Sequence, residues 1–435
     1  MRDFQRKLTN GFYALISLPS TAMGFALSIQ ISALSWILTT QYHLDIHQVG
    51  IVWAAGPLAG IFGQVIIGLV SDRVWFWGGR RRPFIIIGGA LAALMLFALP
   101  NIRAVSDALG VGSLLLVATA IALTLDLAIN VSFNPTRSVI ADVTPEGEAR
   151  TKGYTWMQTI SGFFGVLAYV VGAVAGNFVL IYAGVALVLL FSVIPILFVT
   201  EPRELTGVPD EKRGAPGTPG RRNGGGTQWG QLWRLYAAHA FSWIGVQTMF
   251  VYIIAFIQQK MEFPASPGDA ARVSGQVISI SFAVLNTVGF LLPAPVLEPL
   301  AKRFGRVRVH AAAVAVMAAG YFGVVVGGTS PLALYVLMGV LGIGWASIVS
   351  LPFAIMTEKV DKSRTGFFMG IFNLSVVLPQ LFVSLVLGKV VLDAPDKSVI
   401  FIISGCTLAL SAIGWLFVRE GRSARGTAAE GEGGS

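Results

Sequence analysis

Long apolar segments recur along the whole chain, and this repetition restricts its fold more than any other feature. Of the 435 residues 54% are hydrophobic and only 12% are charged, about half the charged fraction of a soluble domain. Roughly 20 apolar residues in a helix span the hydrocarbon of a bilayer, where each segment must satisfy its own backbone hydrogen bonds. The sequence therefore predicts an all-α membrane protein with twelve transmembrane helices, at 12–39, 48–71, 83–100, 112–141, 153–176, 178–199, 231–258, 273–298, 309–328, 331–356, 366–388 and 398–418.

The basic residues predict the orientation in the membrane. Lys and Arg concentrate on cytoplasmic loops, and most of the 31 in this chain fall on the cytoplasmic side when both termini are placed there. The first segment is too long for a signal peptide and lacks a small-residue cleavage site. We expect a multi-pass protein of the cell membrane with cytoplasmic termini, and the preference for Ala, Gly, Val and Arg suggests a bacterial inner membrane.

A polar stretch divides the chain into two halves. Between Glu201 and Gln228 the apolar pattern is replaced by Gly, Pro, Arg and Glu, which is typical of a flexible linker. The predicted organisation is an N-terminal six-helix bundle at 1–200, a cytoplasmic linker at 201–229, a C-terminal six-helix bundle at 230–420 and a disordered tail at 421–435. Transporters that rock two bundles about a midplane site have this arrangement.

Several other classes of function are excluded or disfavoured. The net charge of +9 is spread over loops and forms no stripe for nucleic acid. One cysteine, Cys406, excludes an internal disulfide and a cysteine metal cluster. We expect no cofactor and no metal, and the chain has no hydrolytic or phosphate-loop motif, so an enzyme is disfavoured.

A charged loop follows the second predicted helix. It reads Gly68-Leu-Val-Ser-Asp72-Arg73, then six residues, then Arg80-Arg81-Arg82-Pro83-Phe84. Asp72 can pair with Arg73 or Arg80 and approach the positive N-terminal end of a neighbouring helix. We expect Asp72, Arg73, Arg80 and Arg81 to act as a gate on the cytoplasmic side. The alternative is a solvated basic loop with a weak surface ion pair.

This loop resembles the signature of the major facilitator superfamily, in the lengthened form of the glycoside-pentoside-hexuronide:cation symporters. Two more stretches are similar to the sucrose:proton symporters and their bacterial relatives: Leu125 to Asp142, and Ser350-Leu-Pro352-Phe353 through Asn373 to Gln380. The resemblance implies the twelve-helix major facilitator fold and a sugar substrate. Val277 and Ile278 stand where the plant sucrose carriers have Arg and Glu, and their external-loop histidine falls one residue from His47. The sugar class is therefore better supported than sucrose itself.

The fourth predicted helix carries polar residues on one face. Asp126, Asn130, Asn134 and Arg137 are spaced by four, four and three residues, which places them on one side of a helix at 100° per residue. Charged side chains at membrane depth are costly and seldom lie there without a task, so this face must point into the bundle. Eleven residues at 1.5 Å separate the two charges by roughly 16 Å, so we expect them to have different roles.

Asp126 is the candidate proton carrier, because desolvation near mid-helix favours the neutral acid. The matching aspartate of the sucrose symporters implies the same role. Arg137 keeps its charge and presents a fixed fork of donors, which suits sugar hydroxyls or a carboxylate, and the resemblance implies a substrate-site residue. The alternative for Arg137 is a structural pair with Asp142 or another acid.

Other predicted helices carry amides and rings suited to a sugar, whose hydroxyls need hydrogen-bond partners and whose CH faces stack on aromatic rings. A buried amide is as often an interhelical contact as a ligand group. With Arg137, Asn130 and Asn134, the candidate substrate-binding residues are Gln158, Trp243, Gln247, Asn286, Asn373 and Gln380.

The predicted function is import of a small glycoside, such as sucrose or maltose, by alternating access with protons as the coupling ion. The expected partners are the sugar, protons and the lipid bilayer, and we expect a functional monomer. The alternatives are a sodium-coupled or uncoupled carrier of another small solute, and a membrane sugar sensor that does not transport. Buried Asp126 disfavours an uncoupled carrier, and the short linker and tail disfavour a sensor.

Overall fold

The computed structural model describes residues 3–61, 74–145, 148–202, 227–360 and 365–420, which are almost entirely helical. The first half contains these α-helices among the described residues: α1 (Asp3–Arg6), α2 (Asn10–Thr40), α3 (Ile46–Trp53), α5 (Arg82–Ala98), α6 (Ile102–Leu109), α7 (Leu114–Val143), α8 (Glu148–Ala175) and α9 (Asn177–Phe198). The second half contains α10 (Trp229–Lys260), α11 (Pro267–Leu291), α12 (Glu298–Phe304), α13 (Arg306–Gly327), α14 (Pro331–Thr357), α15 (Thr365–Phe382), α16 (Gly388–Asp393) and α17 (Val399–Leu416).

Eleven helices within the described residues are long and apolar enough to cross a membrane. They coincide with eleven of the predicted segments and confirm the all-α membrane class. The remaining predicted segment, 48–71, begins in an apolar helical stretch at Ile46–Ile61, and its second part lies outside the described residues. Residues 203–226 of the predicted linker 201–229, the predicted tail at 421–435 and two candidate gate residues, Asp72 and Arg73, lie outside them as well.

Two predicted helices differ in detail from the structure, and proline accounts for one difference. The predicted helix 273–298 begins earlier, at Pro267, and passes through a π-helical turn at Pro293–Leu297 before α12. Proline has no backbone N–H, and after Pro293 and Pro295 the Leu297 N–H bonds back to the Leu292 carbonyl. The predicted helix 83–100 continues through a 3₁₀ turn into α6.

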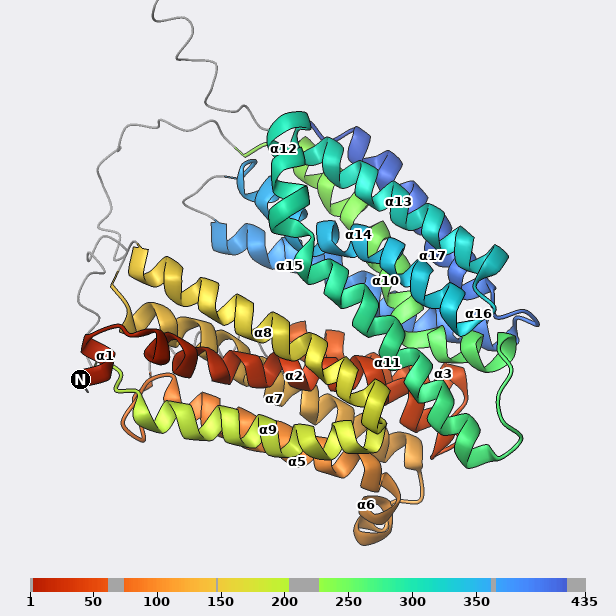
Figure 1. Ribbon diagram of the computed structural model, residues 1–435, viewed down its shortest axis with the longest axis horizontal. Coiled ribbons are helices and arrows are strands. Elements are labelled where there is room, and N and C mark those ends of the chain that lie inside the picture. Colours follow the sequence, from red (N-terminus) through yellow and green to blue (C-terminus); the bar gives the residue numbers. More distant parts are fainter. Residues whose placement is uncertain (1–2, 62–73, 146–147, 203–226, 361–364, 421–435) are drawn as a thin grey trace, which may run out of the picture.

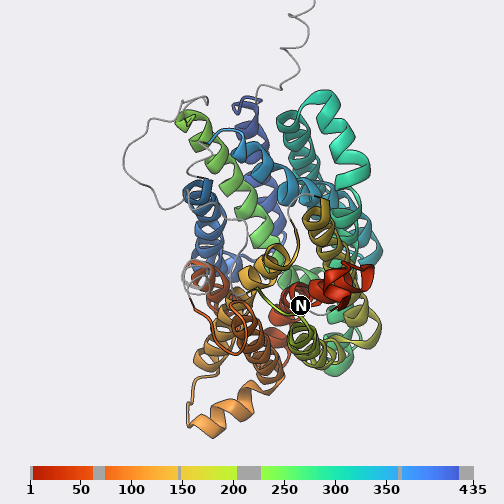
Figure 2. The ribbon, with the colours of Figure 1, turned by 90° about the vertical axis from the view of Figure 1, so that its left-hand side faces the viewer.

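The helices form two groups that correspond to the two halves of the sequence. In the first group α2 packs on α7, α8 and α9, and α5 packs on α7 and α9. In the second group α10 packs on α15 and α17, and α13 packs on α14 and α17. Figure 1 shows the red-to-yellow helices of the first half below the green-to-blue helices of the second, and Figure 2 shows the same two groups from the side that carries the N-terminus.

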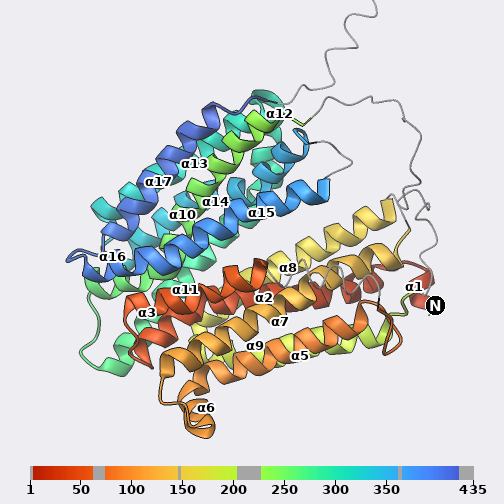
Figure 3. The same cartoon turned by 180° about the vertical axis from the view of Figure 1, so that it is seen from behind.

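We call the side with the N-terminus and the end of α17 the terminal face, and the side with α6 and α16 the distal face. The two groups diverge toward the terminal face and converge toward the distal face (Figures 1 and 3), where α3 contacts α16 and α2 contacts α10 and α11. The V-shaped arrangement places any space between the halves nearer the terminal face.

Hydrogen bonds close the distal contact. The Trp36 indole N–H donates to the Ala271 carbonyl at 2.7 Å, and the Ser35 hydroxyl donates to the Val251 carbonyl at 2.8 Å. The Ser32 and Ser279 hydroxyls lie 2.8 Å apart. These bonds join α2 of the first half to α10 and α11 of the second, so the structure is a state closed on the distal face.

Glycines permit this close approach of the halves. A Cβ on Gly50 of α3 would lie 2.5 Å from the Ser384 carbonyl oxygen and 2.5 Å from the Tyr252 hydroxyl. A Cβ on Gly388 of α16 would lie 3.2 Å from the His47 Cα. Small residues let membrane helices pack at short distance, and here they lie on the two sides of one contact between the halves.

Large apolar side chains cover the outside of the bundle. Val326 is 87% exposed and Val174 is 79% exposed, and many Leu, Phe and Ile side chains are exposed as well. Cys406 of α17 is also exposed, in agreement with a small apolar residue that faces lipid. Water would not tolerate such a surface, whereas hydrocarbon requires it.

Candidate functional site

A cavity of about 320 Å³ lies between the two halves. Its walls come from α2, α7, α10, α14 and α15 and from residues 53–60. Six of the predicted site residues line it: Asp126, Asn130, Trp243, Gln247, Asn373 and Gln380. We call it the acid cavity, because the described residues that line it include one acid, Asp126.

Asp126 lies deep in the cavity wall and is only 4% exposed. Its Oδ2 accepts a hydrogen bond from Gln30 Nε2 of α2 at 3.0 Å. A Cβ on Gly56 would lie 3.4 Å from the same oxygen, so the second predicted helix approaches the carboxyl closely. Among the described residues the Asp126 carboxylate forms no ion pair, and its hydrogen-bond donor is Gln30.

The amide of Gln30 suits both protonation states of the acid. Its NH₂ group donates to a carboxylate, and its carbonyl oxygen can accept from a carboxylic acid after the amide turns over. Gln30 is 4% exposed and lines the cavity with Asp126. Sequence reasoning missed this residue, because a single amide in an apolar helix is not distinguished from an interhelical contact.

Amides of the second half lie across the cavity from Asp126. Gln380 Nε2 of α15 donates to Gln247 Oε1 of α10 at 3.3 Å, and Asn373 lies two turns earlier on α15. In the first half, Asn130 Nδ2 donates to the Asp126 main-chain carbonyl at 2.8 Å. The cavity therefore presents amide groups from both halves, at positions where sugar hydroxyls could replace or extend the bonds between them.

Trp243 supplies an aromatic wall whose orientation is fixed by a histidine. The Trp243 indole N–H donates to His239 Nε2 at 3.0 Å. Because an indole only donates, this contact requires an unprotonated Nε2 and therefore a neutral His239. The His239 ring also stacks on Phe372 at 4.8 Å. His239 is consequently a support for Trp243 in this structure.

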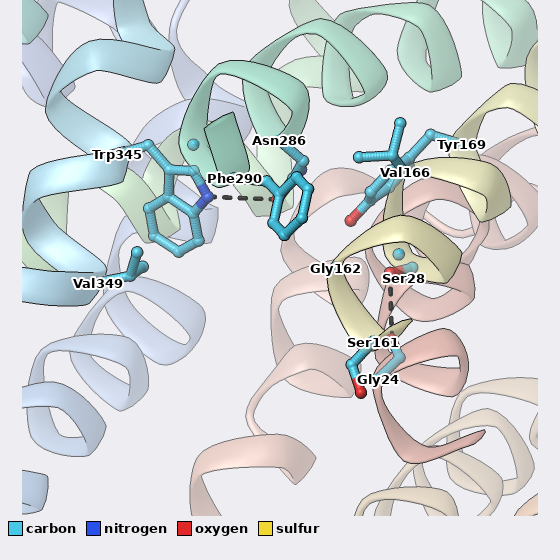
Figure 4. A pocket seen from close by; sticks show the side chains of 12 residues that line it. Gly24, Ser28, Ser161, Gly162, Val166, Tyr169, Asn286, Phe290, Trp345 and Val349 are labelled. Atoms are coloured by element: carbon cyan, nitrogen blue, oxygen red, sulfur yellow. Dashed lines mark hydrogen bonds between the residues drawn. The ribbon is translucent and has the colours of Figure 1, made fainter. Parts of the chain in front are cut away.

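Asn286 lines a neighbouring pocket, shown in Figure 4, together with Trp345. The Trp345 indole N–H donates to Asn286 Oδ1 at 3.3 Å. Trp345 lines the acid cavity as well. Asn286 therefore contacts a residue of the acid cavity but does not line the cavity itself, and Trp345 was not among the predicted site residues. A tryptophan in an apolar helix is typical of packing, and no spacing distinguished this one.

Three predicted site residues line neither of these pockets: Arg137, Asn134 and Gln158. The Arg137 guanidinium lies over the Phe133 ring at 4.2 Å from the ring centroid, and Phe133 lines the acid cavity. Arg137 thus lies one helical turn beyond the cavity lining, toward the terminal face. Asp142, its alternative structural partner, pairs with Arg81 at 3.1 Å.

The two described gate residues, Arg80 and Arg81, lie at the N-terminus of α5. The Glu201 carboxylate, which follows α9, accepts the backbone N–H groups of Arg80, Arg81 and Arg82 at 2.7 to 2.8 Å. The free N–H groups and the dipole at a helix N-terminus favour an anion. The end of the first half therefore binds the start of its own third membrane helix.

The second half repeats this arrangement. The Glu420 carboxylate, which follows α17, accepts the backbone N–H groups of Arg306 and Val307 at 2.8 and 3.0 Å at the start of α13. The sequence before each acid is the same, Leu-Phe-Val-x-Glu, at 197–201 and at 416–420. Gly79 and Gly305 precede the two helices, and a Cβ on either would lie within 3 Å of the carboxylate.

Glu201→Gln is expected to lower the stability of the purified protein more than Glu420→Gln. Glu201 is 6% exposed and receives three N–H groups, and hydrogen bonds to a charged group contribute about 1 to 3 kcal/mol. Glu420 is exposed and receives two, so solvent screens it more. Thermal unfolding in detergent measures both, and equal midpoints for the two variants would contradict this.

Comparisons with known proteins agree with this architecture. The chain is 26% identical to the sucrose transport protein SUT2 of Oryza sativa subsp. indica, over 77% of this chain and 78% of that protein. It is 24% identical to the sucrose transport protein SUC4 of Arabidopsis thaliana, over 77% of this chain and 75% of that protein. A shorter match, 35% identical over 28% of this chain and 23% of its relative, is to the general alpha-glucoside permease of Schizosaccharomyces pombe.

Solved structures show the same fold at low sequence identity. The xylose transporter XylE from E. coli has a TM-score of 0.68 at 16% identity, over 95% of this chain and 97% of that one. The nucleoside transporter NupG has a TM-score of 0.69 at 14% identity, over 94% and 99%. The relatives are transporters, which confirms that the chain is not an enzyme. The family model described as Major Facilitator Superfamily matches residues 17–293 and 272–434, and the chain belongs to this superfamily.

Proposed function

We propose that this multi-pass membrane protein imports a small glycoside together with protons. The observation that carries the proposal is a buried carboxyl, Asp126, that opens onto a cavity lined by amides and indoles from both halves. Its relatives named for sucrose and for alpha-glucosides favour a sugar, and a disaccharide such as sucrose or maltose is the expected substrate.

The residues of the acid cavity suggest how proton and sugar could be coupled. Burial favours the neutral acid at Asp126, whereas access to water favours the carboxylate. In the proposed cycle Asp126 is protonated while the cavity opens to the distal face, and it releases the proton after the halves rock and water enters from the terminal face. Gln30, which donates to Oδ2, would stabilise the carboxylate after that release.

The amides and indoles of the cavity would bind the sugar. Asn130, Gln247, Asn373 and Gln380 offer donors and acceptors for hydroxyls, and the Trp243 ring offers a face for the CH groups of a sugar ring. Because the two halves contribute to one site, bound sugar would change its contacts as the halves move, which is what alternating access requires.

The proposed orientation places the terminal face in the cytoplasm, because the basic residues Arg80, Arg81, Lys302, Arg303 and Arg306 lie there. The proposed membrane is the cell membrane, and a bacterial inner membrane is the expected one. We propose that a monomer suffices for transport, because the two halves of the chain together line the acid cavity.

Uptake into proteoliposomes tests the proposal. We expect labelled sucrose or maltose to accumulate when a proton gradient is imposed, and not when an equal sodium gradient replaces it. Accumulation driven by sodium, or equilibration without accumulation under either gradient, would favour the sodium-coupled or uncoupled carrier. Binding of sugar without any flux would favour a sensor.

A further inference from the structure

A second pocket of about 290 Å³ lies between α2, α8, α11 and α14. We call it the side pocket. Figure 4 shows that its walls come from both halves of the molecule, with Ser28, Ser161 and Tyr169 on the first half and Asn286, Phe290 and Trp345 on the second. The proposed transport cycle at Asp126 does not involve the side pocket.

The described residues that line the side pocket offer the same kinds of groups as those of the acid cavity, except that none of them is acidic. It combines hydroxyls and an amide, on Ser28, Ser161, Tyr169 and Asn286, with aromatic rings on Phe290 and Trp345. Fixed hydrogen-bonding groups beside aromatic faces suit a ring that carries hydroxyls on its edge and CH groups on its face. Among the described residues that line this pocket none carries a charged side chain, so a neutral ring suits it better than an ion.

Glycines hold the aromatic walls in place. A Cβ on Gly162 of α8 would lie 2.3 Å from the Phe290 ring, and a Cβ on Gly289 of α11 would lie 2.7 Å from the Trp345 ring. Both rings therefore pack directly on helix backbone, which restricts their movement. Gly24 of α2 differs, because no atom lies within 4 Å of the place where its Cβ would be. Its backbone borders the open volume of the pocket.

Trp345 joins the side pocket to the acid cavity, because it lines both. Its indole N–H is bound to Asn286 in the side pocket. Its ring packs edge-on against Phe250 at 5.3 Å and Trp243 at 6.0 Å, and both of these residues line the acid cavity. Trp345 therefore borders both pockets, which adjoin at this residue.

The two volumes, about 290 and 320 Å³, are nearly equal, and both are close to the lower bound of the range of about 300 to 1,000 Å³ for ligand pockets. A disaccharide consists of two such rings joined through one oxygen atom, so two adjoining pockets of similar chemistry fit it better than one. We propose that the acid cavity holds one ring of a two-ring glycoside and that the side pocket holds the other, with Trp345 in contact with both rings at its edge. This inference rests on the proposed sugar transport and assigns a site to each part of the substrate.

Gly24→Leu tests the assignment, because Gly24 lines the side pocket and no atom of the described residues lies within 4 Å of the place where its Cβ would be. We expect the dissociation constant of the disaccharide, sucrose or maltose, to rise by about tenfold or more. The dissociation constant of methyl α-glucoside, which has one ring, should stay within about twofold, because the acid cavity is unchanged. Calorimetry on the purified protein measures both.

Gly11→Leu is the matched control, since it makes the same change on the same helix near its exposed end, where the nearest atom would lie 3.9 Å away. It should leave both constants unchanged. Val349→Phe fills the side pocket from α14, where Val349 is 51% exposed, and should reproduce the effect of Gly24→Leu if that variant folds poorly.

Other outcomes of the binding measurements would contradict either the two-ring assignment or the proposed function. Equal weakening of both sugars, no weakening of either, or no binding of methyl α-glucoside to the wild type would overturn the two-ring assignment while leaving sugar transport in place. Absence of sugar binding and sugar flux in the wild type would instead overturn the proposed function itself.

Discussion

Asp126→Asn is expected to exchange sugar across the membrane while losing the ability to accumulate it. Asparagine resembles the protonated acid in shape and polarity but cannot release a proton. Exchange of labelled for unlabelled sugar needs no deprotonation, so it should persist. Each pH unit across the membrane corresponds to about 1.4 kcal/mol, which sustains about tenfold accumulation when one proton accompanies each sugar. In the variant the accumulation ratio should fall to about one.

The measurement pairs counterflow with pH-driven uptake in the same vesicles, and the external pH is recorded. Asp107→Asn on α6 is the control, because it removes one exposed carboxyl that does not line the acid cavity. Sugar-dependent proton entry that persists in Asp126→Asn would remove this residue from coupling. Glu298, Glu358 and His239 would then be the next groups to test.

Gly50→Leu is expected to open the distal contact and to stop transport. A Cβ at position 50 would lie only 2.5 Å from the Ser384 carbonyl oxygen, so the leucine would clash with it. This oxygen belongs to the backbone, which cannot move aside as a flexible side chain can. Overpacking of this kind costs about 1 to 3 kcal/mol, and 1.4 kcal/mol shifts an equilibrium about tenfold. The distally closed state should become a minor one, and turnover should fall by about tenfold or more.

Cysteine labelling reports the opening, in a background with Cys406→Ser. Ser274 of α11 is 1% exposed and bonds to the Ala271 carbonyl of its own helix, so Ser274→Cys should react only when the distal face opens. Gly327→Leu is the control, because no atom lies near the place of its Cβ. Unchanged labelling together with wild-type turnover in Gly50→Leu would show that the contact does not limit closure.

The fold could be predicted from the sequence because a bilayer leaves few choices. Hydrocarbon requires long apolar helices, and eleven of the twelve predicted segments are helices of this kind in the described residues. The bounds were less predictable. Pro293 and Pro295 were included in an ordinary helix, whereas the missing N–H groups produce a π-helical turn.

The candidate site could be predicted where polar residues recur on one face of a helix inside the membrane. Asp126 and Asn130 share a helix face and line the acid cavity, as predicted. Arg137 shares the same face, but periodicity does not limit how far a cavity extends along a helix, and the lining ends at Phe133. Gln30 and Trp345 could not be found from spacing, since each becomes part of the site through a contact with another helix.

The carboxylates of Glu201 and Glu420 have a mechanical consequence. Each acid joins the end of its half to the third membrane helix of the same half, so residues 80–201 and residues 306–420 each form a loop closed by a carboxylate. Strain that arises as the halves rock would be carried around these loops. Two separately expressed halves would then need only each other's surfaces to assemble a working carrier.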